Sequence, residues 1–122
     1  MFKYIMLPAF LLCCCAINAQ VPKNGTYTYD IAFAEWGGKS LGSTVTVWIK
    51  GDSIRIIDNG KSNLSGSKKG DIIEEGIIMR NKKKGVWIIG KKQKDALYPN
   101  PGSCDDEGPT MIDFKKKKWW TC

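Results

Sequence analysis

The side chains of this chain that could perform chemistry are carboxylates, cysteines and tryptophans, because its 122 residues include no histidine. Without imidazole, histidine-dependent serine and cysteine nucleophiles are excluded, and the commonest ligand of zinc and copper is missing. A mechanism that uses two carboxylates would remain, with Glu35, Glu74, Glu75 and the acidic cluster at 104–107 as candidates. Glu74 and Glu75 are neighbours in an extended segment and point to opposite faces, so they would not share a substrate. We therefore predict that the protein is not an enzyme.

The carboxylates of the cluster at 104–107, Asp105, Asp106 and Glu107, could instead offer oxygen ligands to calcium. Their spacing matches no EF-hand loop, and we interpret them as a solvated acidic loop. The sequence contains neither a phosphate-binding P-loop nor a dinucleotide-binding fingerprint. We predict no metal site and no cofactor.

Residues 1–19 have the pattern of a cleaved signal peptide. Lys3 supplies the positive start, residues 5–16 form a short apolar stretch, and Ala19 places a small residue before the expected cleavage point. The apolar stretch is shorter than the roughly 18 to 20 residues that cross a bilayer, so we predict no membrane span. Export to the periplasm or the extracellular space follows. The cysteines at 13–15 permit a lipid-anchored form as the weaker alternative, since they lack the small preceding residues of a lipidation signal.

Once the signal peptide is removed, residues 20–122 form a single domain with two cysteines, Cys104 and Cys122. An even pair of cysteines in a small exported domain predicts a disulfide. A bridge that closes a loop of this length is worth about 3 kcal/mol in the chain-entropy model. The disulfide would tie the end of the chain to the loop that precedes it.

Lysine dominates the positive charge of the chain, which has a formal net charge of +7. Only Arg55 and Arg80 among the 19 basic residues are arginine, the residue that base reading and bidentate phosphate contacts favour. The lysine clusters at 82–84 and 91–94 are separated by one strand, or roughly 20 Å at about 3.3 Å per residue, so they would not form one patch. We predict no nucleic acid partner.

Apolar and polar side chains alternate over much of the mature chain, which is typical of strands with one buried face. The apolar positions of the first two such strands are Tyr27, Tyr29, Ile31, Phe33, Val45, Val47 and Ile49. Turn signals lie at 37–38, 50–53 and 81–85, and irregular loops cover 58–71 and 91–109, with a short helical turn over 93–97. We predict an all-β domain, an antiparallel meander of about seven or eight short strands in a small barrel or strongly curved sheet, with a sandwich as the alternative.

The segment TMIDFKKKKWWTC at 110–122 has the features of a final edge strand. Ile112, Phe114 and Trp120 would share one face of this strand, and Trp119 would lie on the other. Lysine on an edge strand discourages pairing with another chain. We therefore expect a last strand held at its end by Cys122.

Across residues 25–122 the layout resembles the small calycin-like barrels of secreted proteins. The segments GPTMIDFKKKKWWTC and GKSLGSTVTVWIKGDSIRI are also similar to segments of uncharacterised small exported bacterial proteins. The resemblance implies export and a β-rich fold, and it brings no activity or site residue with it.

Tryptophans beside turns are the best candidates for a binding surface, since an exposed ring can stack on a sugar or anchor at an interface. By alternation, Trp48 and Trp87 lie opposite the main apolar face of their strands, and Trp36 lies near the turn at 37–38. The leading hypothesis is non-catalytic binding of a small apolar or anionic envelope ligand at an open barrel end. The alternative is a protein-binding module, such as an inhibitor of a secreted enzyme that inserts the loop 91–109. We expect a monomer.

Overall fold

Seven strands and two short 3₁₀ helices make up the part of the chain that this computed structural model describes, residues 20–104 and 108–122. The elements in order are β1 (Gly25–Phe33), η1 (Ala34–Trp36), β2 (Thr44–Lys50), β3 (Ser53–Ile57), β4 (Ile72–Asn81), β5 (Val86–Gly90), η2 (Gln93–Leu97), β6 (Thr110–Asp113) and β7 (Lys118–Thr121). The predicted signal peptide and the acidic residues 105–107 lie outside the described residues. Within the described ranges, no helix has the length and apolar character needed to cross a membrane.

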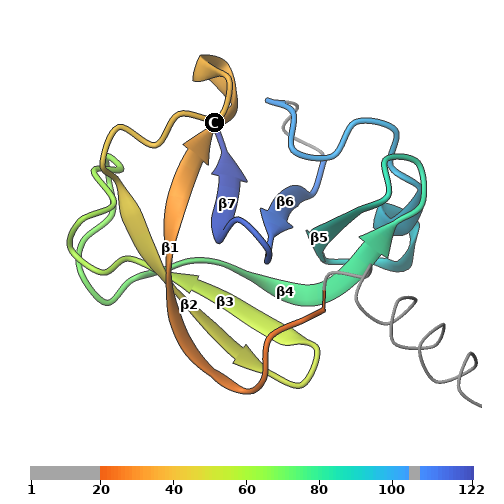
Figure 1. The fold of residues 1–122 in the computed structure, drawn as a ribbon, viewed down its shortest axis with the longest axis horizontal. Coiled ribbons are helices and arrows are strands. Elements are labelled where there is room, and N and C mark those ends of the chain that lie inside the picture. The colour runs from red at the N-terminus through yellow and green to blue at the C-terminus, as the bar shows by residue number, and fades with distance from the viewer. Residues whose placement is uncertain (1–19, 105–107) are drawn as a thin grey trace, which may run out of the picture.

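The strands form a closed barrel in which each strand pairs with the next (Figure 1). All consecutive pairs are antiparallel, and the barrel closes through a parallel pair of β1 and β7. In this closing pair Asp30 lies opposite Lys118 and Phe33 lies opposite Thr121. The predicted all-β meander is confirmed, and closure of the sheet excludes the sandwich.

Alternation along the strands produces the core, because successive side chains point to opposite faces of a sheet. Along β2 every second residue is buried, and β3 follows the same rule. The buried cluster consists of Tyr29, Ile31, Val45, Val47, Ile49, Ile54, Ile56, Ile78, Ile89, Ile112, Phe114 and Trp119. Full burial of one such side chain contributes about 1.5 to 3 kcal/mol, so this cluster is the main stabilising feature of the barrel.

The prediction of one final edge strand over 110–122 was wrong. This segment folds as a hairpin of β6 and β7 around a turn at 114–117, in which Lys117 has a left-handed φ of 56°. The Asp113 carboxylate organises the turn by accepting hydrogen bonds from the backbone N–H groups of Lys115 and Lys116, at 3.0 and 2.8 Å. The hairpin puts Ile112 opposite Trp119, so that both are buried, and β7 has partners on both sides.

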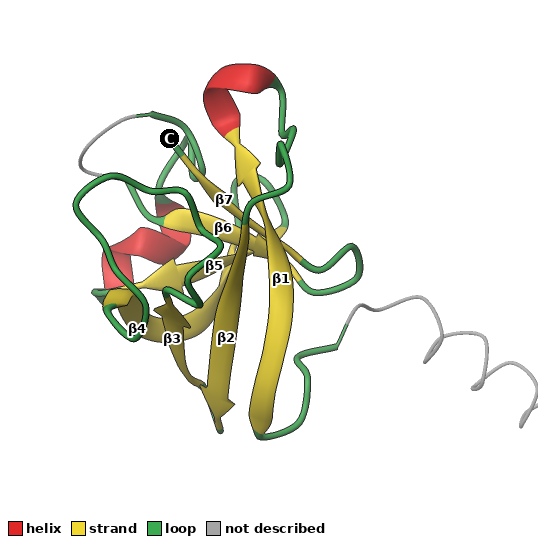
Figure 2. Cartoon of the chain, turned by 90° about the vertical axis from the view of Figure 1, so that its left-hand side faces the viewer, coloured by secondary structure: helices red, strands yellow, loops and turns green. Residues whose placement is uncertain are grey.

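The two ends of the barrel differ because the strands alternate in direction. The long connections 34–43, 58–71 and 91–109 follow β1, β3 and β5 and emerge at one end, which we call the loop end. The short turns 51–52, 82–85 and 114–117 lie at the other end, which we call the turn end. Figure 2 shows these longer connections in green, with η1 projecting beyond the end of β1.

The first part of the loop 91–109 folds back against the outer face of β4 and β5, which η2 contacts. It covers Ile88, which is fully buried although it faces away from the barrel core. Buried Asn81 fixes the loop there, since its Nδ2 donates to the carbonyl oxygens of Asp95 and Tyr98 at 3.1 and 2.9 Å. The predicted disulfide joins Cys104 of this loop to Cys122, with the Cα atoms 5.6 Å apart.

Candidate functional site

The three tryptophans predicted to form a binding surface lie in different places. Trp36 is on η1 at the loop end and is 51 % exposed. Trp48 is on the outer face of β2, with the Arg55 guanidinium 4.7 Å from its ring centroid. Trp87 is on β5, near the turn end. The structure therefore does not bring these residues together on one surface.

Trp87 also differs from its expected orientation. Its ring packs against the barrel core, 6.0 Å from the ring of Phe114, and Arg80 lies over it at 5.0 Å. The alternation rule failed on β5 because the loop 91–109 buries Ile88 on the outer face, so both faces of this strand are apolar. The sequence of a single strand does not distinguish the two faces in such a case.

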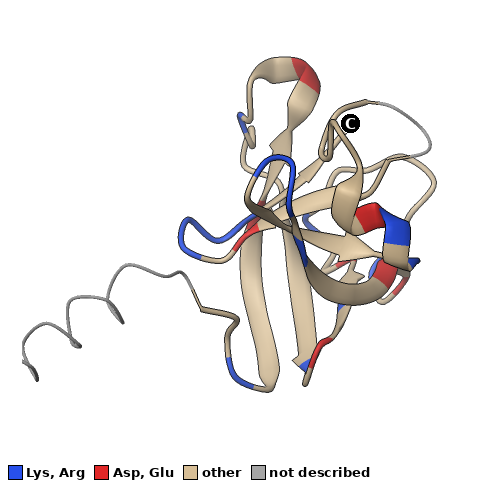
Figure 3. Cartoon of the chain, turned by 90° about the vertical axis from the view of Figure 1, so that its right-hand side faces the viewer, with Lys and Arg blue, Asp and Glu red and all other residues tan. Residues whose placement is uncertain are grey.

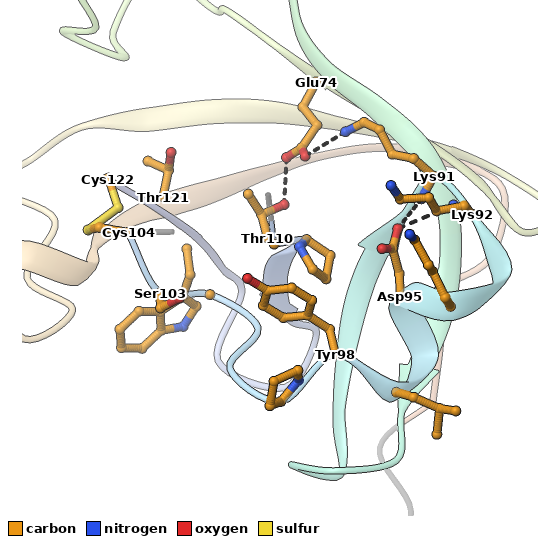
Figure 4. A pocket seen from close by; sticks show the side chains of 17 residues that line it. Glu74, Lys91, Lys92, Asp95, Tyr98, Ser103, Cys104, Thr110, Thr121 and Cys122 are labelled. Atoms are coloured by element: carbon orange, nitrogen blue, oxygen red, sulfur yellow. Dashed lines mark hydrogen bonds and ion pairs between the residues drawn. A yellow bond between two sulfur atoms is a disulfide. The ribbon is translucent and has the colours of Figure 1, made fainter. Parts of the chain in front are cut away.

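A groove of about 1010 Å³ lies at the loop end, between the loop 91–109 and the ends of β4, β6 and β7 (Figure 4). One wall carries the polar side chains of Glu74, Lys91, Lys92, Lys94 and Asp95. The facing surface carries the rings of Tyr98, Pro99, Pro109 and Trp120 and the disulfide. The groove has the mixed lining and the size of a small-molecule site.

Glu74 closes the end of the barrel beside this groove. It points to the same side of β4 as the buried residues because it pairs with Ile56 of β3. Its Oε1 accepts hydrogen bonds from Thr110 Oγ1 at 2.5 Å and from Trp119 Nε1 at 3.1 Å, and its Oε2 lies 2.9 Å from Lys91 Nζ. Both oxygens are thus engaged by donors of β6, β7 and the start of the loop, which leaves the carboxylate a structural acceptor.

Asp95 engages its carboxylate in a similar way. One of its oxygens, Oδ2, accepts from the backbone N–H groups of Lys91 and Lys92 at 2.8 and 3.2 Å, which fixes the first turn of η2. Among the described residues, neither Lys92 nor Lys94 has a carboxylate within ion-pair distance. The two ammonium groups are therefore the part of the groove whose charge is available to a ligand.

Gly108 permits the aromatic part of the groove to pack. A Cβ atom at this position would lie 2.6 Å from Cε2 of Tyr98, which is closer than carbon atoms can approach. The Tyr98 ring therefore rests against bare backbone. A side chain at 108 would move the ring and reshape the groove.

The carboxylates considered for catalysis are dispersed. Glu74 and Glu75 point to opposite faces as predicted, and Glu75 lies outside the barrel, 3.1 Å from Arg55. Glu35 is exposed on η1. In the described ranges no three His, Cys, Asp or Glu side chains are grouped as a metal site would require. The calcium candidates at 105–107 lie outside these ranges.

Sequence reasoning missed the groove, although two of its features left a signal. Lys91 directly follows β5 and Thr110 begins β6, so both belong to strand ends that antiparallel pairing brings to the same end of a barrel. The aromatic wall left no such signal, because it depends on how the loop 91–109 folds back. Comparisons of the chain with protein-family models, with curated proteins and with solved structures found no match.

Proposed function

We propose that the protein is a non-catalytic binding protein that takes a small amphipathic ligand with an anionic group in the groove at the loop end. One observation carries this proposal: the ammonium groups of Lys92 and Lys94, which have no ion-pair partner among the described residues, line the same cavity as the aromatic rings of Tyr98 and Trp120. The anionic group would contact the lysines, and the apolar part would cover the rings of Tyr98 and Trp120.

The charges of the groove favour an anion over a cation. The two acidic side chains among its described lining residues, Glu74 and Asp95, already accept hydrogen bonds from the protein, whereas two of the three lysines there have no carboxylate partner among the described residues. A cation would have to displace existing donors, while an anion would add contacts. Attraction between an anion and exposed ammonium groups is screened by salt, so the proposal requires weaker binding as salt rises.

The barrel interior is not the proposed site. Isoleucine, valine and aromatic side chains fill it, and Glu74 closes its end by reaching across to Thr110 and Trp119. The ligand would therefore lie beside the barrel end, under the loop. The signal-peptide pattern and the disulfide support export, which would make a small anionic component of the cell envelope or of the extracellular medium the ligand.

Two dyes test the proposal. Anilinonaphthalene sulfonate combines fused rings with an anionic group, and phenylnaphthylamine has the same rings without the charge. The double variant Lys92→Ser/Lys94→Ser is expected to weaken the sulfonate roughly tenfold in a fluorescence titration, since two exposed charges are lost. The neutral dye should bind this variant unchanged. Leu97→Ser, which alters an exposed apolar residue of the wall, should weaken both dyes.

The matched control removes the same charge elsewhere. Lys68→Ser/Lys69→Ser changes two exposed lysines of the loop 58–71 and should leave both dyes unaffected. Equal loss of sulfonate binding in the two double variants would refute the groove as the site.

The alternative, a protein-binding module that inserts the loop 91–109 into a partner, has less support. Asn81, η2 and the disulfide hold this loop against the barrel, whereas an inserted loop must project. The projecting element is η1 with exposed Trp36.

A further inference from the structure

Two lysine-rich turns lie side by side at the turn end of the barrel. The turn 82–85 connects β4 and β5, and the turn 114–117 connects β6 and β7. Because β5 pairs with β6, with Trp87 opposite Ile112, the turns are neighbours separated by about 10 Å, or two strand spacings. Figure 3 shows both turns in blue on the same side of the molecule.

The charges of these turns are exposed and unneutralised. Lys82, Lys83 and Lys84 in one turn, and the lysines at 115–117 in the other, are all exposed. Neither ion pair found in the described part of the chain, Arg55 with Glu75 or Lys91 with Glu74, involves any of them. The Asp113 carboxylate is the acidic group of the second turn, and it binds the backbone N–H groups there. Six lysine ammonium groups thus share one end of the barrel.

Local backbone preference does not explain the lysines. Lys117 has a φ of 56°, a left-handed conformation that favours glycine or asparagine in a turn. Like charges on neighbouring turns also repel one another, which lowers the stability of the folded state. The lysines therefore carry two costs, an unfavourable backbone conformation at Lys117 and repulsion between the two turns. This points to a partner that neutralises their charge.

The shape of this end indicates the kind of partner. None of the six lysines lines either of the two grooves near the loop end, and all six stand on exposed turns. A nucleic acid strand requires a groove and rings on which bases stack. Trp87 and Trp119 lie near these turns, but the ring of Trp87 is packed on the core beneath Arg80 and Trp119 is buried in the core. A flat, multivalent anionic surface matches protruding point charges better.

We propose that the turn end docks electrostatically on a lipid bilayer that carries anionic headgroups. Each lysine close to such a surface adds about 1 kcal/mol of attraction, which falls off within a Debye length. The proposal is independent of the ligand proposed for the groove, because it rests on different lysines, none of which lines that groove.

Co-sedimentation with vesicles tests this docking. We expect the full-length mature protein to bind vesicles of phosphatidylcholine with phosphatidylglycerol and to remain unbound with phosphatidylcholine alone. The variant Lys83→Ser/Lys84→Ser/Lys115→Ser/Lys116→Ser should lower the partition coefficient by about a thousandfold, since four of the six contacts, at about 1 kcal/mol each, are lost. Its circular dichroism should match the parent, because all four side chains are exposed.

The matched control Lys39→Ser/Lys61→Ser/Lys68→Ser/Lys69→Ser removes the same net charge from exposed positions in the connections 34–43 and 58–71 at the loop end and should retain most of the binding. Equal losses in the two variants would show attraction by net charge alone and would overturn the proposal. Tighter binding to a single-stranded oligonucleotide than to the anionic vesicles, lost in the first variant, would overturn the choice of a bilayer.

Discussion

At the loop end of the barrel, three long connections are held by networks of side-chain hydrogen bonds, whereas at the turn end each short turn combines a left-handed residue with one side-chain acceptor. Asp58 illustrates the loop end: its carboxylate accepts hydrogen bonds from Ser67 Oγ, Gly60 N and Ser62 Oγ, which fix the start of the loop 58–71.

At the turn end, Gly51 and Gly85 have left-handed φ values that close their turns. The acceptors of backbone N–H groups in the three turns are Asn24, Asn81 and Asp113.

The difference shows which polar side chains of the barrel stabilise its backbone and which remain exposed. Where the chain leaves the sheet, its buried backbone N–H and C=O groups need new hydrogen-bond partners. The side chains of Asn81, Asp95 and Asp58 supply such partners in the long connections. Each tight turn uses a single side-chain acceptor, so the lysine side chains within the turns remain available for contacts outside the molecule. The hydrogen bonds to Asp58, from Ser67 first and then from Gly60, also lower the pKa of its carboxyl group below the ordinary value.

Asn81 connects the turn 82–85 with the loop 91–109, and its replacement should cause the largest loss of stability. Its Oδ1 accepts from Lys83 N and Lys84 N in the turn, while its Nδ2 donates to Asp95 O and Tyr98 O in the loop. Asn81→Asp leaves two buried carbonyl groups facing a carboxylate, so we expect a loss of at least about 3 kcal/mol in the free energy of unfolding, measured with urea.

The control for this substitution is Asn63→Asp, which makes the same chemical change at an exposed residue whose Nδ2 donates to Ser43 Oγ. It should cost less than about 1 kcal/mol. Similar costs at the two positions would contradict the role of Asn81 as the connection between the ends.

The disulfide should stabilise the loop end selectively. The double variant Cys104→Ala/Cys122→Ala removes a bridge across 18 residues, and we expect the free energy of unfolding to fall by about 3 kcal/mol. Amide hydrogen exchange should accelerate most at 92–104, while the turn 82–85 should exchange as in the parent. Uniform acceleration over both ends would show that the bridge acts on the barrel as a whole.

Of these substitutions, the replacement of Tyr29 should change the free energy of unfolding least at neutral pH. Its buried hydroxyl has no hydrogen-bond partner among the described residues, so Tyr29→Phe should change stability by less than about 1 kcal/mol. Burial, reinforced by Tyr27 and Asp113, raises the pKa of Tyr29 from 10.0 to about 12.

The raised pKa of Tyr29 determines how the stability changes at alkaline pH. The folded state holds the phenolic proton more tightly than the unfolded state, so this contribution to stability is complete below pH 10 and is lost as pH rises towards about 12. The parent should therefore lose more stability than Tyr29→Phe over that interval, in urea titrations at successive pH values. Parallel curves would show that the hydroxyl is already hydrated in the folded protein.

Much of the barrel could be predicted because its first strands alternate strictly. In β2 the three aliphatic residues Val45, Val47 and Ile49 are all buried, and no covering loop disturbs the pattern there. The glycine-containing turns at 51–52 and 82–85 were equally visible. Consecutive hairpins then imply a meander, and the number of strands permits its closure.

The hairpin of β6 and β7 could not be predicted in the same way. The turn 114–117 contains no glycine, proline or asparagine, so its lysines resembled the interruption of an edge strand. This misreading also hid the pair of lysine-rich turns, because a continuous strand would carry the second cluster away from the first. The groove was missed for a different reason, since packing of the loop 91–109 depends on the buried amide of Asn81 and not on any local pattern.

The parallel pair of β1 and β7 makes the barrel depend on the two strands that lie furthest apart in the described chain. Contacts between distant segments form late, because a long intervening loop must first be ordered. As the chain is synthesised, one edge of β1 therefore waits without a partner until Trp119 and its neighbours have been added. Folding can be completed only after synthesis has passed these residues, and an unfinished chain would present that edge to any other extended segment nearby.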